Sequence, residues 1–276
     1  SAVTPKLGAL YRATAAWSVF GNFAGGFRAP NAQQVNGTFD SSTIAAVLLP
    51  NPDLKSEKSK NLEFGVRGVM DKLSVDFAAF TGKYDNLIYD KKPLGGRGVT
   101  GDPAIFQTVN IDKATIYGFE LKGNVNWGSF SDARWSTPFS YGVTHGNDDS
   151  TDLPLNSIIP AKLHAGLKME LPMWDLRLDA RYQEAKREGD LDSPYLPKPA
   201  LPPRIKQFTI PSALTLDLSG QWRIRNDLRL NAGVANITNK KYWNWSDVQG
   251  LAATSVVTDA YTQAGRHYSM SLVMDF

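Results

Sequence analysis

Apolar and polar residues alternate along many short stretches of this chain, and the alternation limits the folds that the chain can adopt. The stretch 266–276 shows it most clearly. Its apolar residues fall on one face of an extended strand: Tyr268, Met270, Leu272, Met274 and Phe276. A stretch of about ten residues with one apolar face is long enough to cross the hydrocarbon of a bilayer as a tilted strand. The end of the chain therefore predicts a membrane-crossing strand.

The same alternation recurs along the chain and predicts about eleven strands. They span residues 7–13, 17–27, 61–69, 73–81, 116–126, 135–145, 161–170, 176–183, 214–222, 228–234 and 266–276. The connections alternate between short turns and long loops, and the long loops include 28–59, 85–107 and 184–207. A membrane barrel has short periplasmic turns and long extracellular loops, whereas the loops of a β-sandwich show no such order. The sequence therefore predicts an all-β fold, a transmembrane antiparallel β-barrel.

The composition fits a membrane barrel and excludes several other classes. No apolar run reaches the roughly 18 residues of a membrane helix, and a mean hydropathy of -0.29 is compatible with strands that face water on one side. The absence of cysteine excludes a disulfide scaffold and thiolate metal sites. A net charge of +3 without a dense basic cluster argues against nucleic-acid binding. A soluble β-sandwich or solenoid domain is the alternative, and detergent-dependent solubility would separate it from a barrel.

Five tryptophans lie near the ends of predicted strands. They are Trp17, Trp127, Trp135, Trp174 and Trp222. Aromatic residues in such positions form the interface girdles of membrane barrels, and ordinary packing against turns is the alternative. Bacterial barrels normally have an even number of strands, so an odd count indicates that strands are missing on the N-terminal side.

Several short motifs, in this order and spacing, resemble those of TonB-dependent outer-membrane receptors. They are Phe27-Arg28-Ala29-Pro30, Asn51-Pro52-Asp53-Leu54-Lys55-Ser56-Glu57, Glu63-Phe64-Gly65-Val66-Arg67, Tyr117-Gly118-Phe119-Glu120, Val234-Ala235-Asn236-Ile237-Thr238-Asn239-Lys240-Lys241-Tyr242, Gly265-Arg266 and Phe276. The resemblance implies that residues 1–276 are about eleven C-terminal strands of a barrel of about twenty-two. It also implies that a signal peptide, a TonB box, a plug domain and the first half of the barrel lie upstream of Ser1.

The same resemblance implies a location and a mode of transport. The protein is expected in the outer membrane of a Gram-negative bacterium as a multi-pass protein surrounded by outer-membrane lipid. Such a receptor transports its ligand actively, with energy from the TonB complex delivered through the plug. The paired motifs at 27–30 and 51–54, with the aromatic stretch 242–248, are most similar to haem and haemoglobin receptors. This subgroup implies iron acquisition, with haem or a haem-carrying protein as the transported ligand and no intrinsic cofactor.

Two features leave the ligand open. Haem receptors carry a histidine that binds haem iron between the paired motifs, and the stretch 32–50 contains none. A ferric-siderophore receptor of the same family, which would carry an iron chelate, is therefore the alternative, and a passive porin is a weaker one. Arg28 and Pro30 also have a structural interpretation, in which Arg28 binds backbone carbonyls at the base of the loop and Pro30 ends the strand.

The three histidines, His145, His164 and His267, are the candidate ligand-binding residues. Strand direction places all three toward the extracellular rim, and alternation turns His164 and His267 to the lumen. Neutral imidazole binds iron well, although a hydrogen-bonded lumen histidine is the alternative for each. His145, nearest a loop, is the first choice as a haem ligand. The loop 28–54 and the aromatic residues Tyr242, Trp243 and Trp245 are expected to supply further contacts.

No motif indicates an enzyme. The histidines are far apart in sequence, and neither a Gly-X-Ser-X-Gly elbow nor a His-Glu-X-X-His zinc motif is present. Phe276 is interpreted as an insertion signal for barrel assembly, because outer-membrane barrels of this kind end on an aromatic residue; simple lipid contact is the alternative.

Overall fold

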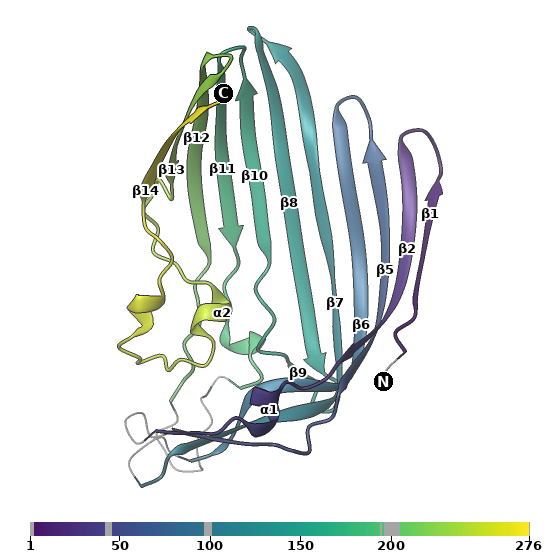
Figure 1. The fold of residues 1–276 in the computed structure, drawn as a ribbon, viewed down its shortest axis with the longest axis vertical. Helices are drawn as coiled ribbons and strands as arrows, with labels where there is room; N and C mark the ends of the chain where they lie inside the picture. The colour runs from purple at the N-terminus through teal and green to yellow at the C-terminus, as the bar shows by residue number, and fades with distance from the viewer. Residues whose placement is uncertain (1–2, 42–45, 97–100, 194, 196–204, 276) are drawn as a thin grey trace.

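The computed structural model describes residues 3–41, 46–96, 101–193, 195 and 205–275, which form one curved sheet (Figure 1). Eleven strands follow one another across this sheet, each antiparallel to its neighbours. They are β1 (Lys6–Arg12), β2 (Trp17–Arg28), β5 (Glu57–Val69), β6 (Leu73–Gly95), β7 (Ala104–Phe130), β8 (Ala133–Asp148), β10 (Lys162–Glu170), β11 (Trp174–Gln183), β12 (Ala213–Arg225), β13 (Leu228–Ala235) and β14 (His267–Met274). The prediction of about eleven antiparallel strands is confirmed.

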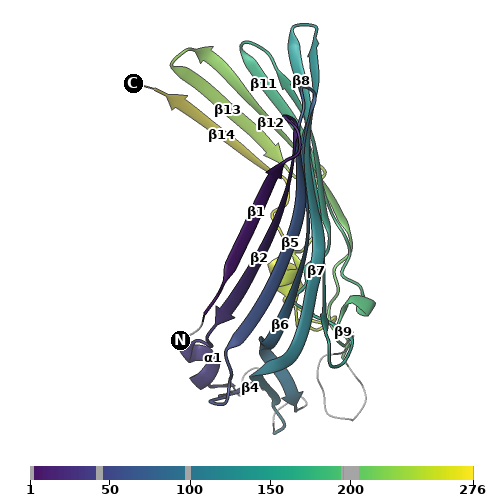
Figure 2. The ribbon, with the colours of Figure 1, turned by 90° about the vertical axis from the view of Figure 1, so that its right-hand side faces the viewer.

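Short turns join the strands at one end of the sheet, and long connections join them at the other (Figure 1). Strands β5 and β6, for example, are joined through Met70, whose N–H donates to the carbonyl of Leu73 at 2.8 Å. The sheet is an open curved wall, and β1 and β14 are its two edges (Figure 2). The predicted alternation of short turns and long loops is therefore confirmed.

The register between strands sorts the side chains onto two faces. Leu163 of β10 lies opposite Tyr182 of β11 on one face, and His164 lies opposite Arg181 on the other. We call these the apolar face and the polar face. In a membrane barrel the apolar face meets lipid and the polar face lines the lumen. Because side chains alternate at every residue, one register fixes the face of each residue in a strand.

Strands β6 and β7 run far beyond the segments predicted from the sequence. They contain 23 and 27 residues, whereas a strand needs about 9–11 to cross a bilayer. Their outer part continues as a ladder in which Leu87 faces Ile111 and Tyr89 faces Val109. The prediction of a loop over 85–107 was therefore wrong. Above the membrane neither face meets lipid, so the alternation that marks a membrane strand is lost.

Smaller elements lie within the long connections. They are α1 (Ala32–Asn36), β3 (Phe39–Ser41), β4 (Ala46–Leu49), β9 (Leu153–Pro154), η1 (Glu188–Asp190), α2 (Trp245–Val248) and η2 (Thr258–Tyr261). Strand β4 pairs in parallel with the outer part of β7, which ties the first long connection to the β6–β7 hairpin. No helix in the described ranges is long and apolar enough to cross a membrane.

The buried apolar clusters lie among the long connections. One consists of Leu191, Ile210, Trp245 and Val248, and it joins the β11–β12 and β13–β14 connections. The other consists of Ile111, Ala114 and Leu155, and it joins β7 to the β8–β10 connection. The loops are therefore packed against one another and against the outer strands.

The five strand-end tryptophans all lie at the short-turn end of the sheet. Trp174 of β11 lies opposite Trp222 of β12, and the two rings are stacked with centroids 5.1 Å apart. Trp17 begins β2, and Trp127 and Trp135 flank the turn between β7 and β8. This arrangement places one aromatic girdle at the periplasmic side of the sheet.

Candidate functional site

A pocket of about 300 Å³ opens on the polar face where the strands meet the long loops. It is lined by Ser140, Lys162, Leu163, His164, Arg181, Tyr182, Gln183, Ala213, Thr215, Tyr242 and Asn244. These residues come from β8, β10, β11, β12 and the β13–β14 connection, and we call the site the rim pocket. It brings together two of the predicted site residues, His164 and Tyr242, with the cations Lys162 and Arg181.

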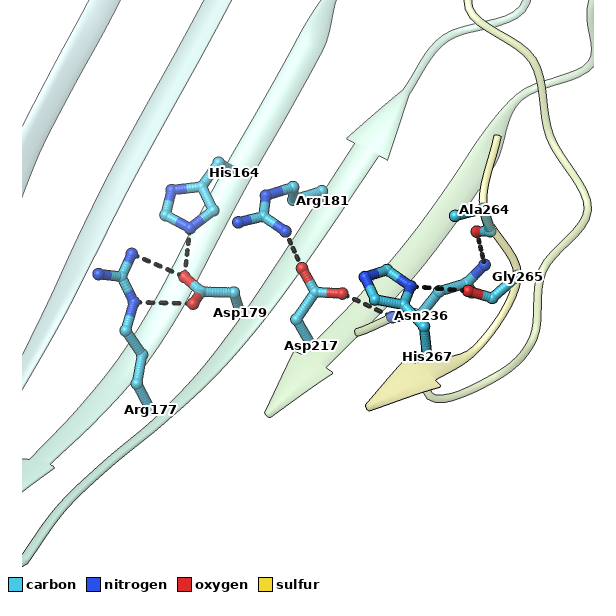
Figure 3. A network of polar contacts seen from close by, with 9 residues as sticks. All are labelled: His164, Arg177, Asp179, Arg181, Asp217, Asn236, Ala264, Gly265 and His267. Carbon is cyan, nitrogen blue, oxygen red and sulfur yellow. Dashed lines mark hydrogen bonds and ion pairs between the residues drawn. The ribbon is translucent and has the colours of Figure 1, made fainter. Parts of the chain in front are cut away.

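Asp179 fixes His164 in the rim pocket (Figure 3). The imidazole Nε2 lies 2.5 Å from Asp179 Oδ1, and Arg177 donates to the same carboxylate at 2.9 Å. The Asp179 side chain is 8% exposed, so the carboxylate needs such partners. Because Nε2 is engaged, a ligand atom would have to approach Nδ1 or displace Asp179.

A second carboxylate, Asp217, holds the neighbouring cation and the base of a loop (Figure 3). It pairs with Arg181 and accepts from the backbone N–H of Asn236 at 2.7 Å. Asn236 has φ of 49°, a left-handed conformation that asparagine adopts more readily than most residues. Its side-chain amide donates to the carbonyls of Lys240 and Ala264, and so closes both ends of the β13–β14 connection.

The structure does not bring the three histidines together. His164 lies on β10 and His267 on β14, and three strands separate them. His267 is exposed on the polar face, and its Nδ1 lies 3.0 Å from the carbonyl of Gly265. Among the described residues, no group of three or more His, Cys, Asp or Glu side chains could hold a metal ion.

His145, the first choice from the sequence, faces away from the lumen. It lies opposite Tyr117, on the face that carries Phe139 and Tyr141, and its ring centroid is 5.4 Å from that of Tyr117. The choice of His145 as a haem ligand therefore stays a prediction, and on this face the imidazole would meet a ligand only outside the lumen. Its position near a loop did not decide which face it occupies, whereas its even spacing from Phe139 and Tyr141 does.

The three aromatic residues of the β13–β14 connection have different roles. Tyr242 lines the rim pocket and is available to a ligand. Trp243 is partly buried, donates from Nε1 to the carbonyl of Thr258 at 2.9 Å, and meets the Phe208 ring edge to face. Its carbonyl accepts from Gln183 of the pocket at 3.0 Å, so Trp243 supports the wall behind Tyr242.

Trp245, which the sequence predicted to contact a ligand, is a core residue of the loops. Its side chain is 1% exposed, and Nε1 donates to the carbonyl of Asn156 at 2.5 Å. The Lys186 ammonium lies 5.5 Å from the ring centroid and donates to the carbonyl of Ile158 at 2.8 Å. Burial lowers the pKa of Lys186. Trp245 therefore binds the β8–β10 and β11–β12 connections to its own.

A polar network ties the same connections to the β6–β7 hairpin. The amide of Asn156 donates to Asp192 at 2.6 Å, and the backbone N–H of Asp192 donates back to Asn156 at 2.9 Å. The Tyr89 hydroxyl of β6 donates to the other Asp192 oxygen at 3.0 Å. Burial, and then the nearby Asp192 charge, raise the pKa of Tyr89, so this phenol stays protonated as a donor. These contacts form one loop platform beside the rim pocket.

Sequence reasoning missed Asn156, Asp192 and Lys186. All three lie in polar connections without periodicity, and their partners are far away in the sequence: Asn156 and Trp245, for example, are 89 residues apart. Only the crowding of aromatic residues at 242–245 signalled that this region packs against something.

Arg28 is a clamp at the base of the first long connection. Its guanidinium donates to the Glu57 carboxylate at 2.8 Å, and the same oxygen accepts from the N–H of Ile88 at 3.1 Å. Strand β2 ends at Arg28, two residues before Pro30. The structural interpretation of this motif fits, but the partner of Arg28 is a carboxylate and not the expected backbone carbonyl.

Asn51 anchors the second paired motif to the β6–β7 hairpin. Its side chain donates to the carbonyl of Thr108 at 2.9 Å and accepts from the N–H of Asp53 at 3.1 Å. Asn110 of β7 binds both the N–H and the carbonyl of Lys55, at 2.8 Å and 3.0 Å. Both motifs therefore fasten the loop 28–54 to the sheet. Phe276, the predicted assembly signal, lies outside the described residues.

The chain matches known proteins along most of its length. A family model described as "TonB dependent receptor-like, beta-barrel" matches residues 1–237. The chain is 26% identical over 272 residues to hemoglobin and hemoglobin-haptoglobin-binding protein A of Haemophilus influenzae, covering 92% of this chain and 25% of that protein. It is 28% identical over 281 residues to transferrin-binding protein A of Neisseria meningitidis serogroup B, covering 91% and 30%. The chain thus spans about a quarter to three tenths of these relatives.

Solved structures share the fold. Copper transporter OprC superposes with a TM-score of 0.72 at 20% identity, over 98% of this chain and 39% of that one. A ferric enterobactin receptor of Pseudomonas aeruginosa in complex with enterobactin superposes with a TM-score of 0.70 at 22% identity, over 99% and 40%. At these identities the similarity shows the fold, which is that of part of a barrel.

Proposed function

Because this chain belongs to the TonB-dependent receptor family and forms part of the wall of a β-barrel in the outer membrane of a Gram-negative bacterium, we propose that it is the C-terminal part of an active-transport receptor for haem or a haem-carrying protein. The rest of the barrel, a plug and a TonB box would belong to the same protein. The TonB complex would act through that plug. The family is one of receptors and transporters, and we propose no catalytic role for this chain.

The loop platform is the observation that carries this proposal. Trp245, Asn156 and Asp192 join connections that would otherwise move separately, so the outer surface is pre-formed. A preorganised surface loses less entropy on binding a large partner such as a haem-carrying protein. The relatives named for hemoglobin and transferrin binding support a protein ligand for this surface.

The rim pocket supplies the groups that a released haem would need. Tyr242 offers a ring and a hydroxyl, and His164 offers an imidazole. Lys162 and Arg181 would attract carboxylates of the ligand. Haem or an iron chelate would be the transported ligand. We assign no resident cofactor to this chain.

A ferric-siderophore receptor is the second candidate. The rim pocket favours it, since its volume of about 300 Å³ suits part of a small anionic chelate. A passive porin fits less well, because the family is one of TonB-dependent receptors.

Haem titration of the full-length receptor tests the proposal. The wild type should give a haem-protein absorption band, and His164→Ala should weaken haem binding by about tenfold through the loss of one ligand or donor. His145→Ala is the matched control, because this imidazole lies on the apolar face and should leave the band unchanged. His267→Ala measures any contribution from the other polar-face histidine.

Three outcomes would change the proposal. A wild type that binds a ferric siderophore and no haem would replace it with the second candidate. Haem binding that is lost in His145→Ala and kept in His164→Ala would contradict the assigned faces. Haem binding that survives in all three variants would place the haem ligands elsewhere in the receptor.

A further inference from the structure

Four lysines gather on the apolar face where β5, β6 and β7 approach the long loops. They are Lys58, Lys60, Lys83 and Lys113, all exposed. The register places them on the face that carries Leu62 and Phe64, which is the face that meets lipid. We call them the rim lysines. A cluster of cations on this face is unexpected, because charge on a lipid-facing surface is costly.

Two rim lysines face each other directly. Lys60 lies opposite Lys83 in the register, and like charges in this arrangement destabilise a sheet. None of the four forms an ion pair within the described part of the chain. Asp85 lies between Lys58 and Lys113, and Asp149 binds Thr115 beside Lys83 at 3.0 Å. Two carboxylates against four lysines leave an excess of positive charge.

The rim lysines lie at the level of the outer membrane interface. Lys83 is about ten residues beyond the short turn that begins β6, which is the length of a strand that crosses a bilayer. Phe27 lies opposite Lys58, and Tyr117 lies opposite Thr81, one side-chain step below Lys83. Aromatic residues beside lysines mark the boundary between hydrocarbon and headgroups.

The cluster is local to these strands. Within the strands β10 to β14 the apolar face carries only uncharged residues, among them Leu163, Ala165, Ala180, Tyr182, Leu214, Leu216, Ala232, Val234, Tyr268 and Met270.

An apolar groove begins directly below the lysine pair. Its volume is about 590 Å³, and its apolar lining includes Leu7, Ala9, Gly21, Phe23, Leu62 and Ala79. Thr81 lines the groove as well. On the same face, Leu62 lies two residues along β5 from Lys60, and Thr81 lies two residues along β6 from Lys83. The small residues Ala9, Gly21 and Ala79 leave room there for a chain of methylene groups.

We propose that the rim lysines and this groove bind one phosphorylated glycolipid of the outer leaflet. A phosphate group would lie between Lys60 and Lys83 and remove their repulsion, while an acyl chain would occupy the groove. Free phosphate shares the first contact but not the second, so the surface is assigned to a lipid. This site is independent of the transported ligand, because it lies on the outside of the barrel.

Binding of bisphosphorylated lipid A to the full-length receptor tests this assignment. The receptor is placed in phosphatidylcholine nanodiscs with or without lipid A, and bound lipid A is measured by native mass spectrometry. The double variant Lys60→Gln/Lys83→Gln should bind lipid A roughly twentyfold less tightly, since two cations next to an anionic headgroup are lost. Lys72→Gln/Lys122→Gln is the matched control, because it removes the same charge from a periplasmic turn and from the polar face.

Two further binding measurements define the ligand. Dephosphorylated lipid A should bind the wild type as weakly as lipid A binds the Lys60→Gln/Lys83→Gln variant, and inorganic phosphate should not compete at equal concentration. Equal lipid A binding by the wild type and Lys60→Gln/Lys83→Gln would overturn the proposal, as would an equal loss in the control variant. Full competition by inorganic phosphate would reduce the site to a general anion site and would also overturn it.

Discussion

Position 65 is occupied by glycine because an aromatic ring fills the space where a side chain would be. Phe20 of β2 is 7% exposed and lies over Gly65 of β5, its partner in the register. A Cβ atom on Gly65 would lie 2.2 Å from the Phe20 ring and 2.6 Å from the carbonyl oxygen of Phe77. The Arg67 guanidinium covers the ring, 4.6 Å from its centroid. The glycine of the Glu63-Phe64-Gly65-Val66-Arg67 motif is thus explained by packing.

Replacing this glycine should therefore destabilise the receptor. Gly65→Ala overpacks the site against both a ring and a backbone oxygen, and overpacking costs about 1–3 kcal/mol. The urea midpoint of the full-length receptor in detergent should fall accordingly. Gly21→Ala is the control, because its Cβ would meet the nearest atom at an ordinary 3.8 Å. A Gly65→Ala receptor as stable as Gly21→Ala would show that Phe20 is free to move aside.

At the scale of single residues, alternation predicted which face a residue occupies but not what it touches. It turned His164 and His267 to the lumen, and the register puts both on the polar face. The same rule, applied to Phe139 and Tyr141, would have turned His145 to lipid. Trp245 was not predictable, because its burial depends on Asn156, a residue in a different loop.

At the scale of elements, the long connections act as one packed unit. The β8–β10, β11–β12 and β13–β14 connections meet at Trp245, and the β6–β7 hairpin joins them through Tyr89. Loops are usually the least stable parts of a protein, and buried apolar contacts are what raises their local stability. The loop platform should therefore resist opening until its buried centre is removed.

Trp245→Ala should open the platform without unfolding the sheet. Loss of a buried tryptophan side chain costs about 3–5 kcal/mol, and here the cost falls on contacts between loops. Limited proteolysis of the full-length receptor should cut residues 184–193 and 236–266 much faster than in the wild type. Tyr261→Ala serves as the control, because this aromatic of the same connection is 42% exposed. Unchanged cleavage of Trp245→Ala would contradict a rigid platform.

The sequence predicted the elements that meet lipid and missed those that do not. Every predicted segment of membrane-crossing length is a strand in the structure, because an apolar face on one side of a strand imposes a sequence period of two. The outer ladder of β6 and β7 and the small strand β4 carry no such constraint. Their pairing depends on contacts between distant segments, such as Asn51 with Thr108.

At the scale of the whole molecule, the sheet has two open edges. Strand β1 pairs only with β2, and β14 only with β13, within the described part of the chain. Unpaired backbone groups at an edge cannot be left in hydrocarbon, so membrane strands close into a barrel. We propose that other strands of the receptor pair with both edges and enclose the polar face as the lumen.

The central claim is that this wall crosses the membrane with its apolar face to lipid and its polar face to water. Spin labels at Leu218 and Ser219, neighbours on β12, test it most directly. Leu218 lies opposite Leu178 and Val234 on the apolar face, and Ser219 lies opposite Arg177 and Gly233 on the polar face. In the full-length receptor in lipid nanodiscs, the label at 218 should be accessible to oxygen, which concentrates in lipid. The label at 219 should be accessible to a water-soluble nickel chelate. Equal accessibility at the two positions, or the reverse pattern, would contradict the claim.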